Sequence, residues 1–413
     1  MFRDENLGLK RYQSRFAIMN RPLQIAVATH FFPSSSQPHR GRPIYEITKA
    51  LAKLADVRVF CVDSAYPRNR LLRPRTFVSR DAEPSYTVPG VNVEYLSYPA
   101  LPLVSRSLNG YNCGRSLIAR LREFRPDLII GYNVYPEGFG AMAAGRELGI
   151  PVVIGALGSD ILGTHDYFVE QLTARTIRKA SLVLTVSDQL RDRAIRYGVE
   201  PEKCITIHNG CDSSIFKPAP REAARTELNV CSGAELVVFV GRLVPLKGIR
   251  ELLEAAAILR ASRPRLRVVC IGEGPMEAEI LHRASQPDLE GRVQVAASTT
   301  PQEISRWLAA ADVLCLPSHS EGCPNVVIEA LSCGRPVVAS DVGGIPELLD
   351  SWCGILVPPR DAQQLANGLA RSLDRQWNQE EIASTFRRSW DEVARETYEA
   401  CCSVHREPAL CAS

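Results

Sequence analysis

The chain has 413 residues, of which 45% are hydrophobic and 23% charged, with 27 glycines and 28 prolines spread along it. That length predicts two or three domains, and the composition excludes disordered, collagen-like and coiled-coil proteins. The apolar runs are far shorter than the roughly 20 residues that a membrane-spanning helix needs. Residues 1–22 carry charges where a secretory signal has an apolar segment. We therefore expect a cytoplasmic protein without a transmembrane helix.

The 13 cysteines are scattered and lack the paired C-x-x-C spacing of a zinc site or a redox motif. We expect them to be reduced and mostly buried. Cys401 and Cys402, which are adjacent in the sequence, are expected at ordinary helix positions.

The net charge of +3 conceals an asymmetry between the two parts of the chain. Residues 1–130 contain 20 Lys and Arg against 10 Asp and Glu, which gives +10 there and −7 in the remainder. A basic surface attracts anionic lipid or a phosphorylated acceptor, although it can also be a plain solvated face. Nucleic acid is not expected, because aromatic interleaving is sparse and no nucleic-acid motif is present. The basic residues gather in two groups, Arg68, Arg70, Arg73, Arg75 and Arg80, and then Arg115, Arg120, Arg122 and Arg125 on a helix expected to end at Pro126.

Short apolar runs rich in β-forming residues alternate with helical patterns along most of the chain. This alternation is typical of βαβ units, in which helices cover both faces of a parallel sheet. The pattern pauses at Pro218 and Pro220 and then starts again. The expected fold class is α/β, with two Rossmann-like doubly wound parallel-sheet domains that face each other across a cleft. The predicted strands are residues 23–29, 57–62, 91–96, 128–131, 152–155, 182–186 and 204–207, then 236–240, 267–271, 293–295, 313–316, 337–339 and 354–357.

Ligands of such sheets bind beyond the carboxyl ends of the strands, so the segments after the strands are the first candidates for a site. Gly241, Arg242, Lys247 and Gly248 follow one strand and precede a helix expected at 249–259. The glycines let the backbone approach a ligand, and the N–H groups of the helix start, together with two cations, favour an anion. The segment suits a diphosphate, although two surface cations beside a turn would also account for it.

The next strand is followed by a weaker signal of the same kind. Gly272 and Gly274 form a short glycine-rich segment, with Pro275 expected at the first position of a helix. A plain strand-to-helix turn explains these residues without any ligand.

The most informative segment is 316–334. A turn from Gly322 to Asn325 precedes a helix expected to begin at about Asn325, so Glu329 lies one turn inside the helix and Glu321 before it. Carboxylates bind sugar hydroxyls and a helix start suits phosphate, so a nucleoside-diphosphate sugar fits across the two glutamates. A capped helix with solvated acids is the alternative. Segment 341–347 adds another glycine loop at the same sheet edge.

These motifs resemble the family 4 retaining glycosyltransferases of the GT-B fold. The resemblance rests on Gly241-Arg242-Leu243 with Lys247-Gly248, on the E-x7-E motif from Glu321 to Glu329, and on segments 330–336 and 341–347. It extends more loosely to 209–218 and to a last helix around 390–394. It implies an acceptor-binding domain at 1–215 with a short extension at 1–22, a donor-binding domain at 216–385, and at 386–413 a tail and helix that crosses back to the first domain.

The resemblance also implies roles for single residues. Arg242 and Lys247 would hold the donor diphosphate and stabilise the leaving nucleotide, Glu321 would bind the transferred sugar, and Glu329 the ribose. Glu321, Arg242 and Lys247 are thus the catalytic candidates. No metal and no other cofactor is expected, because cations and helix N–H groups stabilise the leaving group. The remaining donor-binding candidates are Gly241, Gly272, Gly274, Gly322, Cys323, Pro324, Asn325 and Val326.

In the first domain the likeness is looser. It places His30, Gly41 and the run Gly158-Ser159-Asp160 on the acceptor side of the cleft. This chain has Leu157 where many relatives have a histidine, and the single Gly41 where they have a glycine pair.

We therefore expect a metal-independent retaining glycosyltransferase that acts on a glycan or lipid-linked acceptor of a cell-surface polysaccharide, as a cytoplasmic protein bound peripherally to the membrane. One alternative is a non-catalytic relative that only binds a nucleotide sugar, which Leu157 suggests. The other is a nucleotide-sugar epimerase of the same fold, against which the spacing of Glu321 and Glu329 argues.

Overall fold

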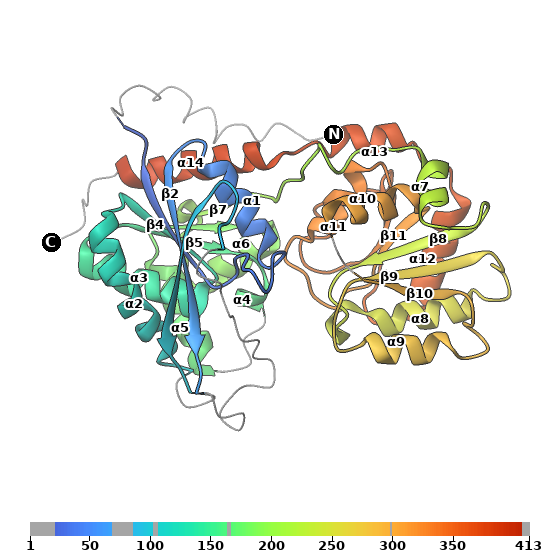
Figure 1. Cartoon of the computed structure of the whole chain (residues 1–413), viewed down its shortest axis with the longest axis horizontal. Helices are drawn as coiled ribbons and strands as arrows, with labels where there is room; N and C mark the ends of the chain where they lie inside the picture. The colour runs from blue at the N-terminus through green and yellow to red at the C-terminus, as the bar shows by residue number, and fades with distance from the viewer. Residues whose placement is uncertain (1–20, 68–85, 102–105, 163–166, 298–299, 407–413) are drawn as a thin grey trace.

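The computed structural model describes residues 21–67, 86–101, 106–162, 167–297 and 300–406. Two parallel sheets follow one another along the chain (Figure 1). The first has the strand order β3-β2-β1-β4-β5-β6-β7 and the second the order β10-β9-β8-β11-β12-β13. Their strands are β1 (Gln24–Thr29), β2 (Asp56–Ala65), β3 (Asn92–Pro99), β4 (Leu128–Tyr132), β5 (Val152–Ala156), β6 (Leu182–Thr185), β7 (Cys204–Thr206), β8 (Glu235–Val240), β9 (Leu266–Ile271), β10 (Val293–Ala296), β11 (Val313–Leu316), β12 (Val337–Ser340) and β13 (Gly354–Val357).

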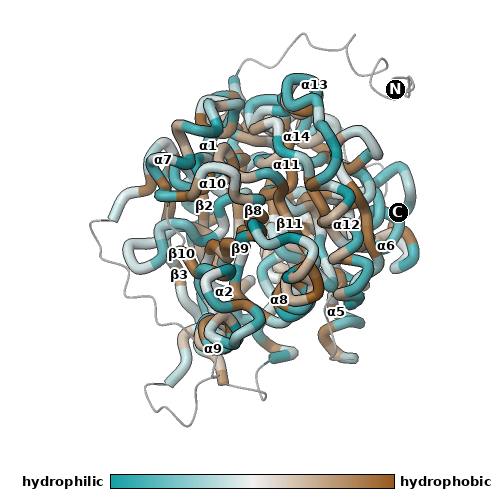
Figure 2. Tube along the Cα trace, turned by 90° about the vertical axis from the view of Figure 1, so that its right-hand side faces the viewer, coloured by the Kyte–Doolittle hydropathy of each residue, from teal (hydrophilic) through white to brown (hydrophobic). Residues whose placement is uncertain are grey.

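Helices cover both sheets, so the inner strands are buried on both faces. All residues of β4, β5, β6, β11 and β12 are buried, and these strands are rich in Val, Ile and Leu, as expected of a covered parallel sheet. Hydrophobic residues concentrate in the interior of the molecule and hydrophilic ones on its outer turns (Figure 2). The helices are α1 (Arg42–Leu51), α2 (Asn109–Phe124), α3 (Phe139–Leu148), α4 (Ser159–Leu162), α5 (Tyr167–Lys179), α6 (Asp188–Arg196), α7 (Arg221–Glu227), α8 (Ile249–Ile258), α9 (Glu277–Ala284), α10 (Pro301–Ala310), α11 (Asn325–Ser332), α12 (Ala362–Asp374), α13 (Gln379–Thr385) and α14 (Trp390–Arg406), with short turns η4 (Val134–Gly138), η5 (Pro201–Lys203) and η6 (Pro245–Lys247).

The last helix returns to the first sheet (Figure 1). A reciprocal cap begins it: the N–H of Ser389 donates to the Glu392 carboxylate (2.7 Å) and the N–H of Glu392 donates to the Ser389 hydroxyl (3.2 Å). Val393, Ala394 and Cys401 of α14 are buried in the same apolar cluster as residues of β1 and α1. Helix α14 therefore ties the end of the chain to its first half.

The predicted α/β class and all the predicted strands are confirmed, with ends that differ by a few residues. Helix α1 begins at Arg42, and Gly41 takes its N-cap position in a left-handed conformation with φ 65°. The prediction for Pro275 was wrong: Met276 is the N-cap of α9, so the proline precedes the helix.

The cysteines, the apolar helices and the basic groups were also subjects of predictions from composition. Among the described cysteines none is in a disulfide and all but Cys231 are buried, including Cys401 and Cys402 in α14. Within the part of the chain that the structure describes, no helix combines the length and the apolarity that crossing a membrane requires. Of the two basic groups, the one on α2 is described, whereas Arg68, Arg70, Arg73, Arg75 and Arg80 lie outside the described residues.

Candidate functional site

Three loops at the carboxyl edge of the second sheet pack on one another. They follow β8, β9 and β11, which are neighbours in the sheet. The N–H of Gly241 donates to the carbonyl of Ile271 (2.9 Å), and the N–H of Leu243 to that of Glu273 (2.8 Å). On the other side, the N–H of His319 donates to the carbonyl of Leu246 (2.8 Å). The segments predicted separately to bind a donor therefore form one continuous surface.

Glycine is required at the contact between two of these loops. Gly248 has φ 67°, and a Cβ atom there would lie 1.8 Å from the carbonyl oxygen of Pro317. Gly272 and Gly274 have the same function on the other side, because a Cβ on either would meet the backbone of Gly241 or Leu243. These glycines hold the loops together, which is a structural role that the sequence signal alone could not distinguish from ligand binding.

Lys247 and Glu321 lie side by side within this surface. The Lys247 Nζ is 2.5 Å from the Glu321 Oε1, which also accepts a hydrogen bond from the Ser318 hydroxyl at 2.6 Å. The Glu321 side chain is 9% exposed and that of Lys247 is 21% exposed. Arg242 is exposed, and within the described chain no ion pair or hydrogen bond engages its side chain. The site thus presents a held cation, a held carboxylate and an accessible guanidinium.

The turn after Glu321 lies against the first half of the chain. A Cβ on Gly322 would be 2.3 Å from the carbonyl oxygen of Leu157, and the N–H of Gly344 donates to the Gly322 carbonyl at 2.8 Å. The Asn209 amide donates to the Cys323 carbonyl (3.2 Å) and to the Asn325 side chain (2.7 Å). Pro324 is the N-cap of α11, which begins at Asn325 as predicted, and Val326 is half-buried in its first turn.

Glu329 is buried inside α11 and faces a cation from the first half of the chain. The Nη1 of Arg42 lies 3.3 Å from the Glu329 Oε1. Burial raises the pKa of Glu329. The positive charge of Arg42 lowers this pKa, and the negative charge of Glu46 raises it further. The sequence indicated that Glu329 lies at the cleft but missed Arg42, whose only signal was its place directly after Gly41.

The acceptor-side candidates lie in the first half of the chain, after β1 and after β5. His30 follows β1, and its Nδ1 is 2.8 Å from the Oε2 of Glu137, a buried residue of η4 that the sequence did not single out. A Cβ on Gly158 would lie 3.1 Å from the Gly322 Cα, so this glycine lies directly against the turn after Glu321. Ser159 begins α4.

Asp160 is held by backbone N–H groups of the protein itself, whereas a group that contacts a substrate is expected to be accessible. Its carboxylate accepts N–H bonds from Gly158 (2.8 Å), Leu157 (3.2 Å) and Val134 (3.3 Å). Burial raises the pKa of Asp160 and these N–H groups oppose the rise. Asp160 therefore shapes the loop that carries Leu157 and Gly158.

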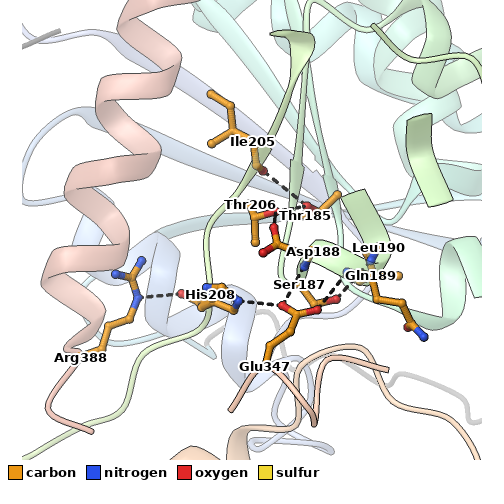
Figure 3. Close-up of polar contacts among 10 residues, drawn as sticks. All are labelled: Thr185, Ser187, Asp188, Gln189, Leu190, Ile205, Thr206, His208, Glu347 and Arg388. Carbon is orange, nitrogen blue, oxygen red and sulfur yellow. Dashed lines mark hydrogen bonds and ion pairs between the residues drawn. The ribbon is translucent and has the colours of Figure 1, made fainter. Parts of the chain in front are cut away.

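A second contact between the two halves of the chain centres on Glu347 (Figure 3). Its carboxylate accepts N–H bonds from Asp188 (2.8 Å) and Gln189 (2.9 Å) at the start of α6, and its Oε2 is 2.9 Å from the His208 Nε2. Burial alone would raise the pKa of Glu347, but these hydrogen bonds outweigh it and hold the pKa below its ordinary value. Segment 341–347, predicted as one more ligand loop, thus also joins the two halves.

No group of three or more His, Cys, Asp or Glu residues in the described part of the chain is arranged to hold a metal ion.

Comparisons with known proteins agree with this geometry. The family described as "Glycosyl transferases group 1" matches residues 220–396, and the "Glycosyl transferase 4-like domain" matches residues 41–210. TuaC of Bacillus subtilis (strain 168), a glycosyltransferase named for teichuronic acid biosynthesis, is 30% identical over 358 residues, which are 84% of this chain and 89% of that protein. A D-inositol 3-phosphate glycosyltransferase of Thermobispora bispora is 36% identical over 204 residues, 47% of each chain.

Solved structures share the fold. Anabaena HepE, crystallised with UDP, superposes with a TM-score of 0.70 at 21% identity, covering 92% of this chain and 100% of that one. Sucrose-phosphate synthase from Thermosynechococcus elongatus gives a TM-score of 0.72 at 20% identity, covering 93% and 99%. Two parallel sheets, loops that converge at one sheet edge and two family matches along the chain lead to one conclusion. The chain belongs to the group 1, or family 4, glycosyltransferases of the GT-B fold, which transfer a sugar from a nucleotide sugar.

Proposed function

We propose that this protein is a metal-independent retaining glycosyltransferase whose donor lies across the loops after β8, β9 and β11. Arg242 and Lys247 bind the diphosphate, Glu321 binds the transferred sugar and Glu329 the ribose. The backbone from Gly322 to Val326 offers N–H groups to the sugar and phosphate. Preorganised cations and N–H groups stabilise the charge that develops on the leaving nucleotide.

The observation that carries this proposal is the contact of Lys247 with Glu321 at 2.5 Å beside the Ser318 hydroxyl. A phosphate oxygen attracts the ammonium group and a sugar hydroxyl donates to the carboxylate, so a diphosphate sugar can satisfy both groups at once. The exposed Arg242 adds a forked donor that suits the same diphosphate. The pair therefore stands where the bond between sugar and phosphate would break.

We further propose that the acceptor is a glycan or a lipid-linked intermediate of polysaccharide synthesis, bound beside His30, Gly41, Gly158 and Ser159, with Asp160 holding the loop that carries Gly158. TuaC, named for teichuronic acid biosynthesis, supports a polysaccharide acceptor. The charge of +10 in residues 1–130 supports contact with an anionic membrane surface, and hence a peripheral cytoplasmic location.

Exposed apolar side chains support an acceptor that has a lipid part. Leu108 and Tyr111 are 54% and 49% exposed at the start of α2, and Tyr167 and Phe168 are 69% and 70% exposed at the start of α5. Helix α2 follows β3, and α5 follows β5 after the short helix α4, so both begin on the side of the carboxyl edge of the first sheet. The apolar side chains thus stand at the edge that bears the proposed acceptor residues.

We also propose that residues 1–215 bind the acceptor and residues 216–385 bind the donor. Residues 386–413 contain the crossing helix and the tail. The separate sheets and the packing of α14 on the first half support it.

The test is a donor panel. UDP-, GDP- and ADP-sugars are incubated with the protein, and release of the nucleotide and the anomeric configuration of the product are followed by nuclear magnetic resonance. We expect one donor to be turned over slowly even without acceptor, with a retained configuration in the transferred product. Binding without any turnover in the presence of extracts that contain candidate acceptors would favour the non-catalytic alternative that Leu157 suggests, and an inverted product would refute the retaining mechanism.

A further inference from the structure

Among the described residues of the first half of the chain, only Arg42 forms an ion pair with a carboxylate that is predicted to bind the donor. It is the first residue of α1, yet its Nη1 lies 3.3 Å from the Oε1 of Glu329 in α11. The Arg42 side chain is 20% exposed and that of Glu329 is 9% exposed, so little water screens this contact.

The charges that face Glu329 leave Arg42 as the dominant favourable partner. Among the described groups that act on the pKa of Glu329, Arg42 lowers it and Glu46, on the next turn of α1, raises it. Cys211 of the interdomain segment and Cys333 at the end of α11 are also close, but burial raises the pKa of both thiols, so they are neutral at pH 7. Burial raises the pKa of Glu46, Arg42 and Lys49 lower it, and Asp212 raises it further.

The backbone fixes where the Arg42 guanidinium can go. Gly41 takes a left-handed conformation, and a Cβ there would lie 2.1 Å from the carbonyl oxygen of Phe31, so the loop before Arg42 allows only glycine. The guanidinium also lies 5.4 Å from the centre of the Phe216 ring. The dipole of a helix favours negative charge at the helix start, and Arg42 is positive. The guanidinium is therefore held there by the carboxylates that it contacts.

We propose that Arg42 is a positioning residue of the donor site, which keeps the Glu329 carboxylate ionised and oriented to accept hydrogen bonds from the ribose hydroxyls. The donor site is then completed by the first half of the chain, and donor binding is coupled to the apposition of the two halves. This inference rests on the proposed role of Glu329 in binding the ribose.

The proposal predicts a change in pH dependence. Burial already raises the pKa of Glu329, and removal of the Arg42 charge raises it further. A protonated carboxyl accepts hydrogen bonds from hydroxyls poorly, so donor affinity is lost at a higher pH as the solution is acidified. An opposite charge at this distance shifts a carboxyl pKa by about 1 unit or more.

The experiment measures donor KM and kcat between pH 5 and 8 for Arg42→Met, Arg42→Lys and the control Lys53→Met. Lys53 forms an exposed ion pair with Asp391 of α14, so its replacement removes an ion pair without touching Arg42 or Glu329. For Arg42→Met we expect donor KM to rise roughly tenfold at pH 7 with little change in kcat, and the acid limb of kcat/KM to move up by about one pH unit. Arg42→Lys restores most of the affinity, and Lys53→Met behaves like the parent protein.

Glu329→Gln separates this inference from the function on which it rests. We expect Glu329→Gln to raise donor KM, and Arg42→Met to add nothing in that background, because the group on which it acts is gone. If Glu329→Gln raises donor KM but Arg42→Met changes neither KM nor its pH dependence, the positioning role is refuted and the proposed function stands. If Glu329→Gln itself has no effect, the ribose assignment fails. Thermal unfolding checks that each variant is folded. If Arg42→Met does not fold, donor KM and kcat of Arg42→Gln between pH 5 and 8 test the positioning role instead.

Discussion

Replacement of Glu347 by glutamine tests how the two halves of the chain are held together. In the native protein this carboxylate accepts two backbone N–H bonds at the start of α6 and lies 2.9 Å from the His208 Nε2 (Figure 3). Arg388 in turn donates to the His208 carbonyl at 3.0 Å. Glutamine has nearly the same shape, but it has no charge and only one acceptor oxygen.

The expected loss follows from these contacts. The amide can keep one of the N–H bonds, while its NH2 group faces another donor, so at least one charge-assisted hydrogen bond is lost. Such bonds contribute about 1.5–3 kcal/mol each, and a carboxylate at a helix start adds roughly 0.3–1 kcal/mol. Because the Glu347 side chain is 20% exposed, the lower part of this range applies, and we expect a loss of about 2 kcal/mol at pH 7.

The loss depends on pH in a definite direction. The pKa of Glu347 is lower in the folded protein than its ordinary value. A depressed carboxyl pKa gives stability that is fully present above the unfolded-state pKa, about 4.3, and is lost as the pH falls through the folded-state value. The difference in stability between the parent protein and Glu347→Gln should therefore be fully present at pH 7 and shrink below about pH 4.3.

Thermal unfolding at pH 7 and at pH 3.5 to 4 measures this difference. A loss of 2 kcal/mol corresponds to a decrease of about 4–8 °C in Tm for a domain of this size. The control is Glu123→Gln, since Glu123 is 69% exposed and its ion pair with Arg120 is long, at 3.6 Å, so its Tm should stay within about 1 °C. An unchanged Tm for Glu347→Gln at pH 7, or a loss of the same size at both pH values, would refute the reasoning.

Three further predictions concern the donor loops and the basic region. Lys247→Ala and Glu321→Ala should each lower turnover roughly tenfold or more in a donor-hydrolysis assay, and unchanged rates would overturn the site assignment. Gly248→Ala should lower Tm and weaken nucleotide binding in a thermal-shift titration, because its Cβ would lie 1.8 Å from the Pro317 carbonyl oxygen. The control Gly291→Ala has nothing within 4 Å of the added Cβ, so its Tm should fall by a smaller amount, which reflects only the positive φ. Neutralising four arginines should reduce cosedimentation with anionic vesicles at low salt, and unchanged binding would remove the basic segment from the proposal; the four are Arg68, Arg70, Arg73 and Arg75.

Local sequence determined the order and limits of the elements. Strands such as β11 are continuous runs of buried apolar residues, because helices cover both faces of a parallel sheet, so their limits could be read without any tertiary information. Helix α11 begins at Asn325 as predicted, because the turn residues before it cannot continue a strand. The prediction of the start of α9 failed at Pro275, because the proline lies just before the N-cap residue Met276 and not at the first helical position.

The donor loops could also be predicted, because glycine and charge at the end of a strand carry a local signal. Arg242, Lys247, Glu321 and Glu329 all follow β8 or β11, and adjacent parallel strands bring their carboxyl ends to one edge. What the spacing did not indicate is that Gly272 and Gly274 are needed for loop packing and that Asp160 binds its own loop.

The sequence by itself determined the fold class, the run of strands and helices, and the loops of the donor site, since each depends on residues near one another in the chain. Only the tertiary structure decided which groups from the two halves meet: Arg42 with Glu329, and Glu347 with His208 and the start of α6. Such pairs leave no periodic or motif signal, because their members are far apart in the chain and one partner alone resembles any surface charge. Their meeting depends on how the two sheets are placed relative to one another, which is a property of the packed chain.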